Sequence, residues 1–209
     1  MKREIFFQNF FLYSKKKNKY HWRMAKKIAK NKSLTPFKGY IQVYTGNGKG
    51  KTTAAIGLAL RAAGNGLRSY IGQFMKGQKY GELKSIKSFK KFITIEQFGK
   101  KSFIHVKKLP NKEDVEMAKK GLEKCENAML LGEYQIIILD EINVAVYFNL
   151  LKEKDVINFL KKKPENVEII LTGRYAPKSF IEIADLVTEM KEIKHYYSKG
   201  IKARTGIEK

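Results

Sequence analysis

The glycine-rich segment at residues 45–53 contains the residue types that bind a polyphosphate; it reads Thr-Gly-Asn-Gly-Lys-Gly-Lys-Thr-Thr. Glycines let several backbone N–H groups converge on one anion, because no side chain blocks the approach. We expect Lys51 to contact the phosphate oxygens and Thr52 to offer its hydroxyl to Mg²⁺. The segment therefore predicts a nucleotide site whose contacts are Gly46, Asn47, Gly48, Lys49, Gly50, Lys51, Thr52 and Thr53.

The segments around this loop decide between a phosphate site and a plain turn. The apolar run at residues 40–44 is typical of a buried strand, and residues 51–64 are typical of a helix, whose N-terminus adds free N–H donors. The usual pattern is G-x-x-x-x-G-K-[ST]; its first glycine would fall at position 45, which is Thr45 here, so Gly46 comes one residue late. A plain turn would leave Lys49 and Lys51 without a role, so the flanking segments favour phosphate binding.

Two adjacent carboxylates, Asp140 and Glu141, follow a second apolar run at residues 135–139. In enzymes with a phosphate-binding loop, a carboxylate in this position holds Mg²⁺ directly or through water. The second carboxylate can ligate the metal or orient a nucleophile. The alternative is a strand that ends in a solvated acidic turn, but the upstream glycine loop favours the metal. We predict Mg²⁺ ligands at Thr52, Asp140 and Glu141, and catalytic roles for Lys51, Thr52 and Glu141.

Residues 111–114 spell N-K-x-D, the motif with which GTPases read guanine. In a GTPase that motif comes after the metal-binding strand, whereas here it precedes Asp140. Asn111 also opens an apparent helix, where its side chain is a good N-cap and Asp114 lies in the first turn. We therefore interpret the motif as a helix cap.

Strand-like and helix-like segments alternate after Pro36. The strand-like segments are near-continuous apolar runs, as in a parallel sheet that is buried on both faces. We expect strands at residues 40–44, 69–74, 92–97, 134–139, 167–171 and 185–188. We expect helices at residues 51–64, 82–90, 113–131, 154–162 and 178–184. The pattern predicts a three-layer α/β fold like that of P-loop NTPases, with a mostly parallel central sheet whose carboxyl edge carries the glycine loop.

The composition limits what the protein binds and where it acts. The formal net charge is +23, but only six of the 43 basic residues are arginines, the side chain that base and phosphate readers favour. We therefore expect no nucleic-acid binding, and interpret the lysines as a solvated surface that attracts nucleotides or acidic proteins. We expect no membrane contact, because no apolar stretch approaches the ~20 residues that span a bilayer. The single Cys125 excludes an internal disulfide and, as a packing residue, suits the cytoplasm.

The chain divides into a basic N-terminal extension, residues 1–35, and one domain, residues 36–209. The extension is either a flexible arm or a helix that caps the nucleotide site. Its apolar start superficially resembles a signal peptide, but Gln8 and Asn9 interrupt it and no small-residue cleavage site follows. Met24 is an alternative initiator, and intact-mass spectrometry of the native protein would decide between the two starts.

Several further blocks, taken with the glycine loop, resemble one known family, the P-loop corrinoid adenosyltransferases (ATP:cob(I)alamin adenosyltransferase). The loop has the shortened spacing of that family, so its departure from the general pattern becomes a match. The resemblance covers roughly residues 38–209 and includes residues 73–77, 140–143, 171–174, 184–190, 193–195, 200–203 and 206–208.

The resemblance implies alkyl transfer, in which a reduced corrinoid attacks the 5′ carbon of ATP and triphosphate leaves as a unit. The acceptor would be cob(I)alamin or cob(I)yrinic acid a,c-diamide, with ATP in reversed polarity so that C5′ faces the corrin. Co(I) is already a strong nucleophile, so the protein supplies positioning and charge stabilisation through Lys51, the loop amides and Mg²⁺. We also expect a homodimer and a flavoprotein reductase as the electron donor.

The resemblance adds three residues outside the glycine loop. Family members commonly place a Phe-x-Trp pair against the corrin after the third strand, and here Phe103 takes the first place and His105 the second. Phe103 would pack on the corrin, whereas His105 is either a corrin contact or an exposed loop histidine. Arg174 is either a contact for the ATP phosphates or a surface arginine that pairs with Glu189 or Glu192.

Two other classes of function fit parts of the sequence. A P-loop ATPase or kinase would release phosphate or a phosphorylated acceptor instead of triphosphate. A corrinoid carrier or a nucleic-acid-binding protein would perform no chemistry, and nucleic-acid binding would fall steeply with added salt.

Overall fold

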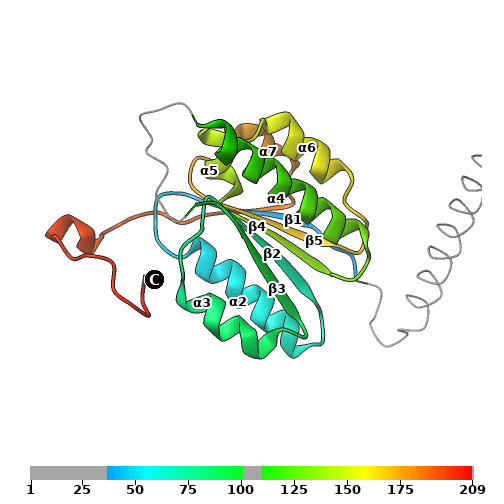
Figure 1. Ribbon diagram of the computed structural model, residues 1–209, viewed down its shortest axis with the longest axis horizontal. Helices are drawn as coiled ribbons and strands as arrows, with labels where there is room; N and C mark the ends of the chain where they lie inside the picture. The colour runs from blue at the N-terminus through cyan, green and yellow to red at the C-terminus, as the bar shows by residue number, and fades with distance from the viewer. Residues whose placement is uncertain (1–36, 101–109, 209) are drawn as a thin grey trace, which may run out of the picture. The chain divides into compact units, whose positions relative to one another are not determined.

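Six parallel strands form one sheet in the computed structural model, which describes residues 37–100 and 110–208 (Figure 1). The strand order is β3-β2-β4-β5-β1-β6, and each of the five pairings is parallel. The strands are β1 (Ile41–Thr45), β2 (Ser69–Phe74), β3 (Ile93–Phe98), β4 (Ile136–Asp140), β5 (Glu168–Thr172) and β6 (Leu186–Glu189). Residues 1–35, predicted to be an extension, lie outside the described residues.

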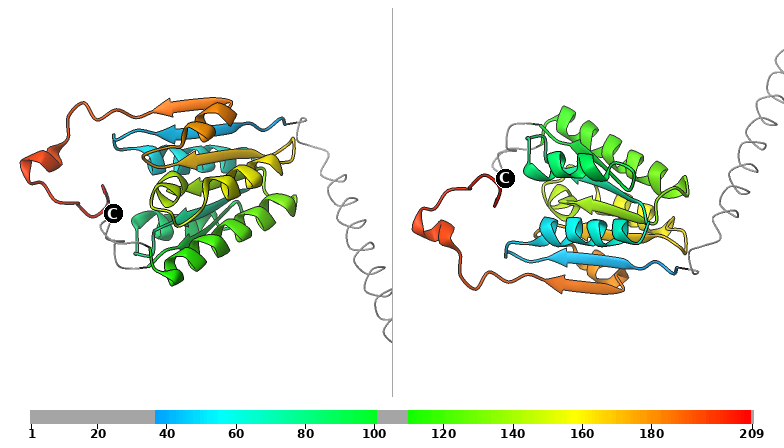
Figure 2. Two further views of the ribbon diagram at one scale, coloured as in Figure 1. Left: turned by 90° about the horizontal axis from the view of Figure 1, so that it is seen from above. Right: turned by 90° about the horizontal axis from the view of Figure 1, so that it is seen from below.

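Helices cover both faces of the sheet (Figures 1 and 2). One face carries α2 (Lys51–Gly64), α3 (Gly81–Ser85) and the 3₁₀ helix η1 (Ile86–Phe89). The other face carries α4 (Lys112–Leu130), α5 (Ile142–Tyr147), α6 (Glu153–Lys161) and α7 (Lys178–Ile183). A second 3₁₀ helix, η2 (Tyr196–Lys199), lies in the C-terminal segment beyond β6. This arrangement confirms the predicted three-layer α/β fold.

Each face of the sheet has its own hydrophobic core, because successive side chains of a strand point to opposite faces. Ile138 and Ile170 pack with Ala55 and Ala59 of α2 on one face. Their neighbours along the strands, such as Ile137, belong to the core on the α4 side. Burial on both faces explains why the strands are continuous apolar runs in the sequence. The edge strand β6 is the exception, since all four of its residues are exposed.

The observed helices differ from the expected ones in three places, one of which is the unpredicted 3₁₀ helix η2. The single helix expected at residues 82–90 is interrupted, with α-helical geometry ending at Ser85 and a 3₁₀ turn continuing to Phe89. Helix α5 was not predicted; it starts at Ile142, directly after the two carboxylates. A six-residue helix presents too few turns for a helical period to show in the sequence.

Two smaller interpretations are confirmed. The side chain of Asn111 accepts a hydrogen bond of 2.8 Å from the backbone N–H of Asp114, so the N-K-x-D segment caps α4. Cys125 is fully buried on α4 and packs in the core. Burial raises the pKa of its thiol, which makes it a packing residue rather than a reactive one.

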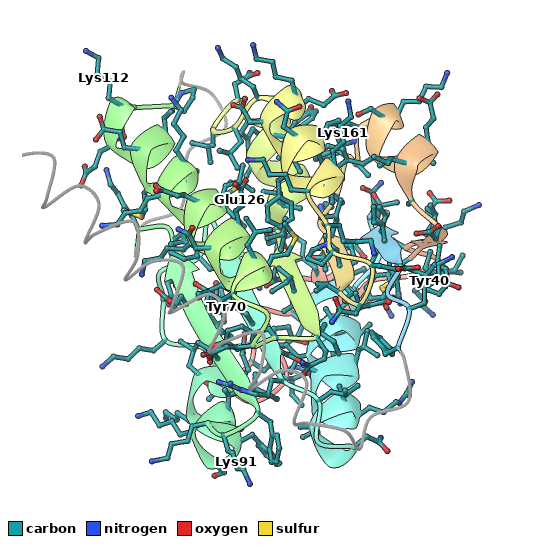
Figure 3. All side chains as sticks on the ribbon, turned by 90° about the vertical axis from the view of Figure 1, so that its right-hand side faces the viewer. Tyr40, Tyr70, Lys91, Lys112, Glu126 and Lys161 are labelled. Carbon is teal, nitrogen blue, oxygen red and sulfur yellow. The ribbon has the colours of Figure 1, made fainter. Side chains whose placement is uncertain are left out.

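Lysines are dispersed over the helical layers (Figure 3). All three labelled lysines are exposed: Lys91 lies in the turn between η1 and β3, Lys112 begins α4 and Lys161 ends α6. Within residues 37–100 and 110–208, no helix combines the length and the apolar character needed to cross a membrane.

Candidate active site

The glycine loop connects β1 to α2 and packs against the chain that follows β6. Gly46 and Gly50 have left-handed φ angles of 92° and 119°, which favour glycine. A Cβ atom on Gly46 or Gly48 would lie 2.4 or 2.7 Å from the carbonyl oxygen of Met190. The backbone N–H of Gly48 donates to that same oxygen at 2.6 Å. The glycines are therefore required by the turn and by this close contact, in addition to any phosphate that they bind.

Lys51 is buried at the centre of the loop, with 7% of its surface exposed. Its Nζ donates to the carbonyl oxygens of Gly46 and Gly48, both at 2.7 Å. Burial lowers the pKa of this amine, and the nearby Glu141 partly offsets the effect. The structure thus places a cation among the loop carbonyls at the start of α2, where the helix dipole also favours anions.

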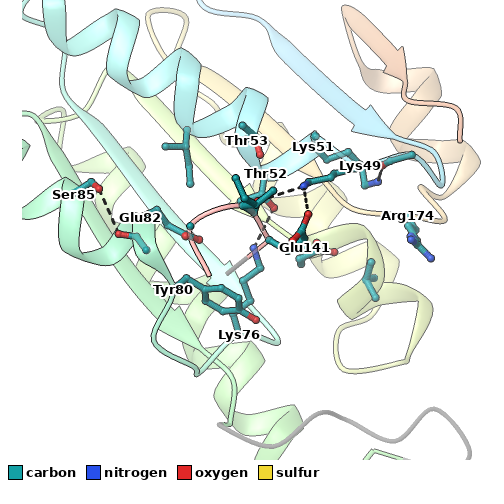
Figure 4. A pocket seen from close by; sticks show the side chains of 18 of the residues that line it. Lys49, Lys51, Thr52, Thr53, Lys76, Tyr80, Glu82, Ser85, Glu141 and Arg174 are labelled. Atoms are coloured by element: carbon teal, nitrogen blue, oxygen red, sulfur yellow. Dashed lines mark hydrogen bonds and ion pairs between the residues drawn. The ribbon is translucent and has the colours of Figure 1, made fainter. Parts of the chain in front are cut away.

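A pocket of about 730 Å³ opens beside the loop (Figure 4). It brings together eight of the predicted site residues, namely Gly48, Lys49, Gly50, Lys51, Thr52, Thr53, Glu141 and Arg174. Lys76, Tyr80, Glu82 and Ser85 line it from the α3 side, and Gly206, Ile207 and Glu208 line it from the C-terminal segment. Gly46, Asn47 and Asp140 are not among the lining residues. The pocket volume is in the range of small-molecule sites.

Asp140 ends β4 beneath the pocket and is 1% exposed. Its Oδ1 accepts hydrogen bonds from the hydroxyls of Thr52 at 2.9 Å and Thr172 at 2.7 Å. Its Oδ2 accepts from the amide of Gln73 at 3.1 Å and from the amine of Lys76 at 2.8 Å. Four side chains, from the start of α2, the end of β2 with the residues just after it, and the end of β5, therefore converge on one carboxylate, which ties the start of α2 to the carboxyl edge of the sheet.

Glu141 has a left-handed backbone, with a φ of 63°, which is uncommon for a residue other than glycine. Its N–H donates to the hydroxyl of Thr172 at 3.0 Å, while its side chain lines the pocket. Burial, followed by repulsion from Asp140, raises the pKa of the Glu141 carboxyl, although Lys76, Lys51 and Arg174 counteract both effects. A raised pKa at a strained pocket residue is typical of functional sites.

Lys76 extends from the segment after β2 towards Thr52 (Figure 4). Its Nζ lies 3.1 Å from the hydroxyl oxygen of Thr52 as well as 2.8 Å from Asp140. Burial lowers the pKa of Lys76, but the charge and the hydrogen bond of Asp140 outweigh it, so the net shift is upward. The amine therefore remains a cation at neutral pH.

The oxygen groups of Thr52, Asp140 and Glu141 suit the predicted Mg²⁺. In the described part of the chain, no group of three or more His, Cys, Asp or Glu side chains forms a metal site by itself. Mg²⁺ commonly binds one or two carboxylates and completes its shell with phosphate and water. A hydroxyl and two adjacent carboxylates beside a phosphate loop fit that requirement, so the residues present fit the metal.

Lys49 extends from the loop to the C-terminal segment. Its amine lies 2.8 Å from Glu208 Oε1 and donates to the hydroxyl of Tyr196 at 3.1 Å. Glu208 also accepts from Tyr196 and from Arg204. The sequence predicted a phosphate contact for Lys49, and the structure adds a carboxylate partner for the same amine.

The remaining predicted residues have different outcomes. Arg174 is exposed and lines the pocket, and across residues 37–100 and 110–208 it forms no ion pair with Glu189 or Glu192. Its contact with ATP phosphates stays a prediction. Phe103 and His105 lie outside the described residues.

Sequence reasoning assigned no role to three residues around Asp140: Gln73, Lys76 and Thr172. The segment 73–77 was noted only as a match to the family. The signal that could have found Lys76 is its place two residues after β2, because the carboxyl ends of neighbouring parallel strands meet at one edge. The sequence does not reveal, however, that β2 is the neighbour of β4, or that Gln73 pairs in register with Asp140.

Comparisons with known proteins agree with the geometry. A model of the family described as ATP:corrinoid adenosyltransferase BtuR/CobO/CobP matches residues 37–208. A corrinoid adenosyltransferase from Sinorhizobium sp. is 38% identical over 193 residues, 89% of this chain and 89% of the relative. Another from Salmonella typhimurium is 32% identical over 173 residues, 82% of this chain and 86% of the relative. An uncharacterized protein from Nostoc sp. is 36% identical over 183 residues, which are 81% of this chain but 48% of that protein.

Proposed function

This chain belongs to the ATP:corrinoid adenosyltransferase family, and we propose that the pocket beside Lys51 is where it transfers the adenosyl group of ATP to a reduced corrinoid. One observation carries the assignment of the site. Four cationic side chains from three segments, the glycine loop and the residues after β2 and β5, line the same pocket: Lys49, Lys51, Lys76 and Arg174. Such a concentration of cations beside a glycine loop suits the triphosphate of a nucleotide.

The proposed chemistry needs little acid–base help from the protein. The electron pair of Co(I) forms the bond to C5′ of ATP, and the C5′–O bond breaks with its electrons passing to the triphosphate. No proton moves in that step. The protein must hold the two reactants in line, which can lower the barrier by ~7–11 kcal/mol, and must stabilise the charge on the leaving group.

Lys51 and the loop N–H groups are the proposed stabilisers of that charge. Lys51 is held by two carbonyl oxygens of its own loop, so its amine is already oriented before phosphate binds. Thr52, Asp140 and Glu141 would hold Mg²⁺, which supplies further neutralisation of triphosphate charge when bound. We assign catalytic roles to Lys51, Thr52 and Glu141, and nucleotide contacts to residues 46–53 and Arg174.

Phe103 and His105 are proposed to face the corrin, following the resemblance to the family. They come shortly after Lys100, whose amine pairs with Glu113 and Asp114 at the start of α4. A Phe103→Ala protein should adenosylate more slowly from Co(II) corrinoid plus reductase. An unchanged rate would remove the assignment.

The products identify the reaction. We expect anaerobic incubation with MgATP and cob(I)alamin to release one triphosphate for each adenosylcorrinoid formed, measured by ion chromatography. ADP and phosphate without adenosylcorrinoid would instead support the ATPase alternative. Comparing kcat/KM for cob(I)alamin and for cob(I)yrinic acid a,c-diamide would identify the preferred acceptor.

The partners and the location of the enzyme are also proposals. An acidic flavoprotein is the expected electron donor, since the lysine-rich chain would attract it. Its docking should weaken as salt is raised. We propose a cytoplasmic homodimer, for which sedimentation equilibrium would give twice the chain mass of 24.2 kDa.

A further inference from the structure

The amine of Lys76 lies between two of the groups that are expected to bind Mg²⁺. It is 2.8 Å from Asp140 Oδ2 and 3.1 Å from the hydroxyl oxygen of Thr52. Metal–oxygen distances for Mg²⁺ are about 2.0–2.1 Å, so an ion held by these same oxygens would lie close to the ammonium group. Two cations this close that share one carboxylate repel each other.

Both neighbours of Lys76 in the chain make close backbone contacts, and these contacts fix the point from which its side chain extends. Met75 donates its N–H to the carbonyl oxygen of Phe98 at 3.2 Å. Gly77 packs against the end of β3, where a Cβ atom would lie 2.2 Å from the carbonyl oxygen of Gly99. Both neighbours of Lys76 are thus attached to the β3 end of the sheet.

The surroundings of the Lys76 side chain favour a cation. The amine lies 5.4 Å from the centre of the Tyr80 ring, a cation–π contact. Only 15% of the side chain is exposed, yet the side chain lines the nucleotide pocket. The Lys76 amine can therefore contact the phosphate groups of a nucleotide in that pocket without a rearrangement of the sheet.

We propose that Lys76 is an internal cation that competes with a divalent metal for Asp140 and Thr52, and that nucleotide binding resolves the competition. This inference rests on the proposed function, since it assumes that the pocket takes MgATP. Without nucleotide, the ammonium group satisfies Asp140 and keeps divalent ions weakly bound. The triphosphate adds negative charge that can pair with both the Lys76 ammonium group and the metal ion, so metal and nucleotide bind together.

The test measures Mn²⁺ binding by electron paramagnetic resonance on the full-length protein without nucleotide. Lys76→Met should bind Mn²⁺ at least 10-fold more tightly than wild type, and Mg²⁺ should displace the ion. Lys76→Arg keeps the charge and should stay as weak as wild type. Lys79→Met is the matched control, because Lys79 is an exposed lysine of the same segment that does not line the pocket; its affinity should match wild type.

Two further variants test whether the gain in Mn²⁺ affinity depends on Asp140 and replace Lys76→Met if that variant does not fold. Adding Asp140→Asn to Lys76→Met should abolish the gain. Lys76→Gln, which keeps a donor to Asp140, should show the same gain if the methionine variant does not fold. Equal Mn²⁺ affinity in wild type and in every folded variant without the Lys76 charge would overturn the proposal.

The two proposals fail separately. Wild-type protein that forms no adenosylcorrinoid would contradict the proposed function, whatever the Mn²⁺ result. Normal adenosylation by wild type, with no gain of Mn²⁺ affinity on removing the Lys76 charge, would contradict only the competition.

Discussion

Two buried carboxylates lie on neighbouring strands at opposite ends of the sheet. Asp140 is the last residue of β4 and is 1% exposed, whereas Glu168 is the first residue of β5 and is 6% exposed. Their burial is nearly the same. Their partners and surroundings are not.

The donors around the two carboxylates differ in kind. Glu168 accepts from the backbone N–H of Tyr40 at 2.7 Å and from the side chain of Gln42. Both donors belong to one short segment at the start of β1. Among the described residues, the Asp140 carboxylate accepts only from side chains, and these come from three separate segments.

The nearby lysines differ in the same way. At the Glu168 end, the amine of Lys163 donates to three backbone carbonyl oxygens, those of Gly39, Pro164 and Val167. At the Asp140 end, the amine of Lys76 bonds to two side chains and lines the pocket. Side chains can change partners when a ligand arrives, whereas backbone partners of packed strands stay in place. Burial of a carboxylate therefore does not by itself mark a functional site in this fold.

The largest effect is expected at Lys51, the buried cation on the Asp140 side. Lys51→Met should lower kcat/KM for adenosylation about 10³-fold, because it removes a pre-oriented donor from the leaving group. Stopped-flow spectra of the corrinoid would measure this loss of kcat/KM. Lys163→Met removes the partly buried cation at the other end and should leave kcat/KM unchanged in the folded protein. A comparable loss from both variants would contradict the contrast between the two ends.

Asp140→Asn should lower kcat/KM about 10²-fold and raise the Mg²⁺ concentration needed for half-maximal rate. The substitution removes the charge that attracts the metal but keeps an oxygen acceptor for Thr52 and Thr172. Activity titrations with MgCl₂ would measure both changes. An unchanged Mg²⁺ requirement would show that Asp140 acts only in packing.

Glu168→Gln should lower the free energy of unfolding by ~1–3 kcal/mol, because the amide replaces one accepting oxygen with a donor facing Gln42 or the N–H of Tyr40. Urea denaturation followed by circular dichroism would measure it. Turnover per folded molecule should stay at the wild-type level. A selective loss of turnover would give Glu168 a role that the structure does not assign to it.

The smallest effect is expected at Glu208. Hydrogen bonds from Arg204, Lys49 and Tyr196 hold the pKa of this carboxyl well below its usual value of 4.5. A lowered carboxyl pKa gives stability that is present above the usual value and is lost only as pH falls towards the lowered one. Hydrogen exchange at residues 204–208, corrected for intrinsic rates, should therefore be the same at pH 8 and pH 5.

Glu208→Gln should speed that exchange and change the KM for ATP by no more than about 3-fold, as expected for an exposed contact. Strong dependence of the wild-type exchange on pH between 8 and 5 would contradict the ionised contact. A large change in KM would place Glu208 among the nucleotide contacts.

The sequence predicted those features that depend on local patterns. Strands buried on both faces must be apolar throughout, which made the inner strands recognisable. All six strands, including the exposed edge strand β6, lie within a residue or two of their predicted bounds. The glycine loop was recognised from its glycines and Lys-Thr between a strand and a helix, and the structure adds that Gly46 and Gly50 have left-handed φ angles, which favour glycine. The capping role of Asn111 followed from its spacing to Asp114.

What escaped prediction depends on contacts between distant segments. The network around Asp140 requires the register of β2 against β4, which sets Gln73 opposite Asp140. Sequence patterns set the face of a strand but not its neighbour. The left-handed turn at Glu141 could not be anticipated either, because glutamate rarely adopts it. Helix α5, which begins directly after that turn, was missed because its six residues are too few to show a helical period.

The most direct test of the central claim mixes the protein with MgATP and chemically reduced cob(I)alamin under argon. If the Lys51 pocket holds ATP for alkyl transfer, the Co(I) spectrum should be replaced by that of a light-sensitive cobalt–carbon bond, and Lys51→Met should slow the change about 10³-fold. A Co(I) spectrum that persists with wild-type protein would contradict the account. So would a Lys51→Met protein that reacts at the wild-type rate.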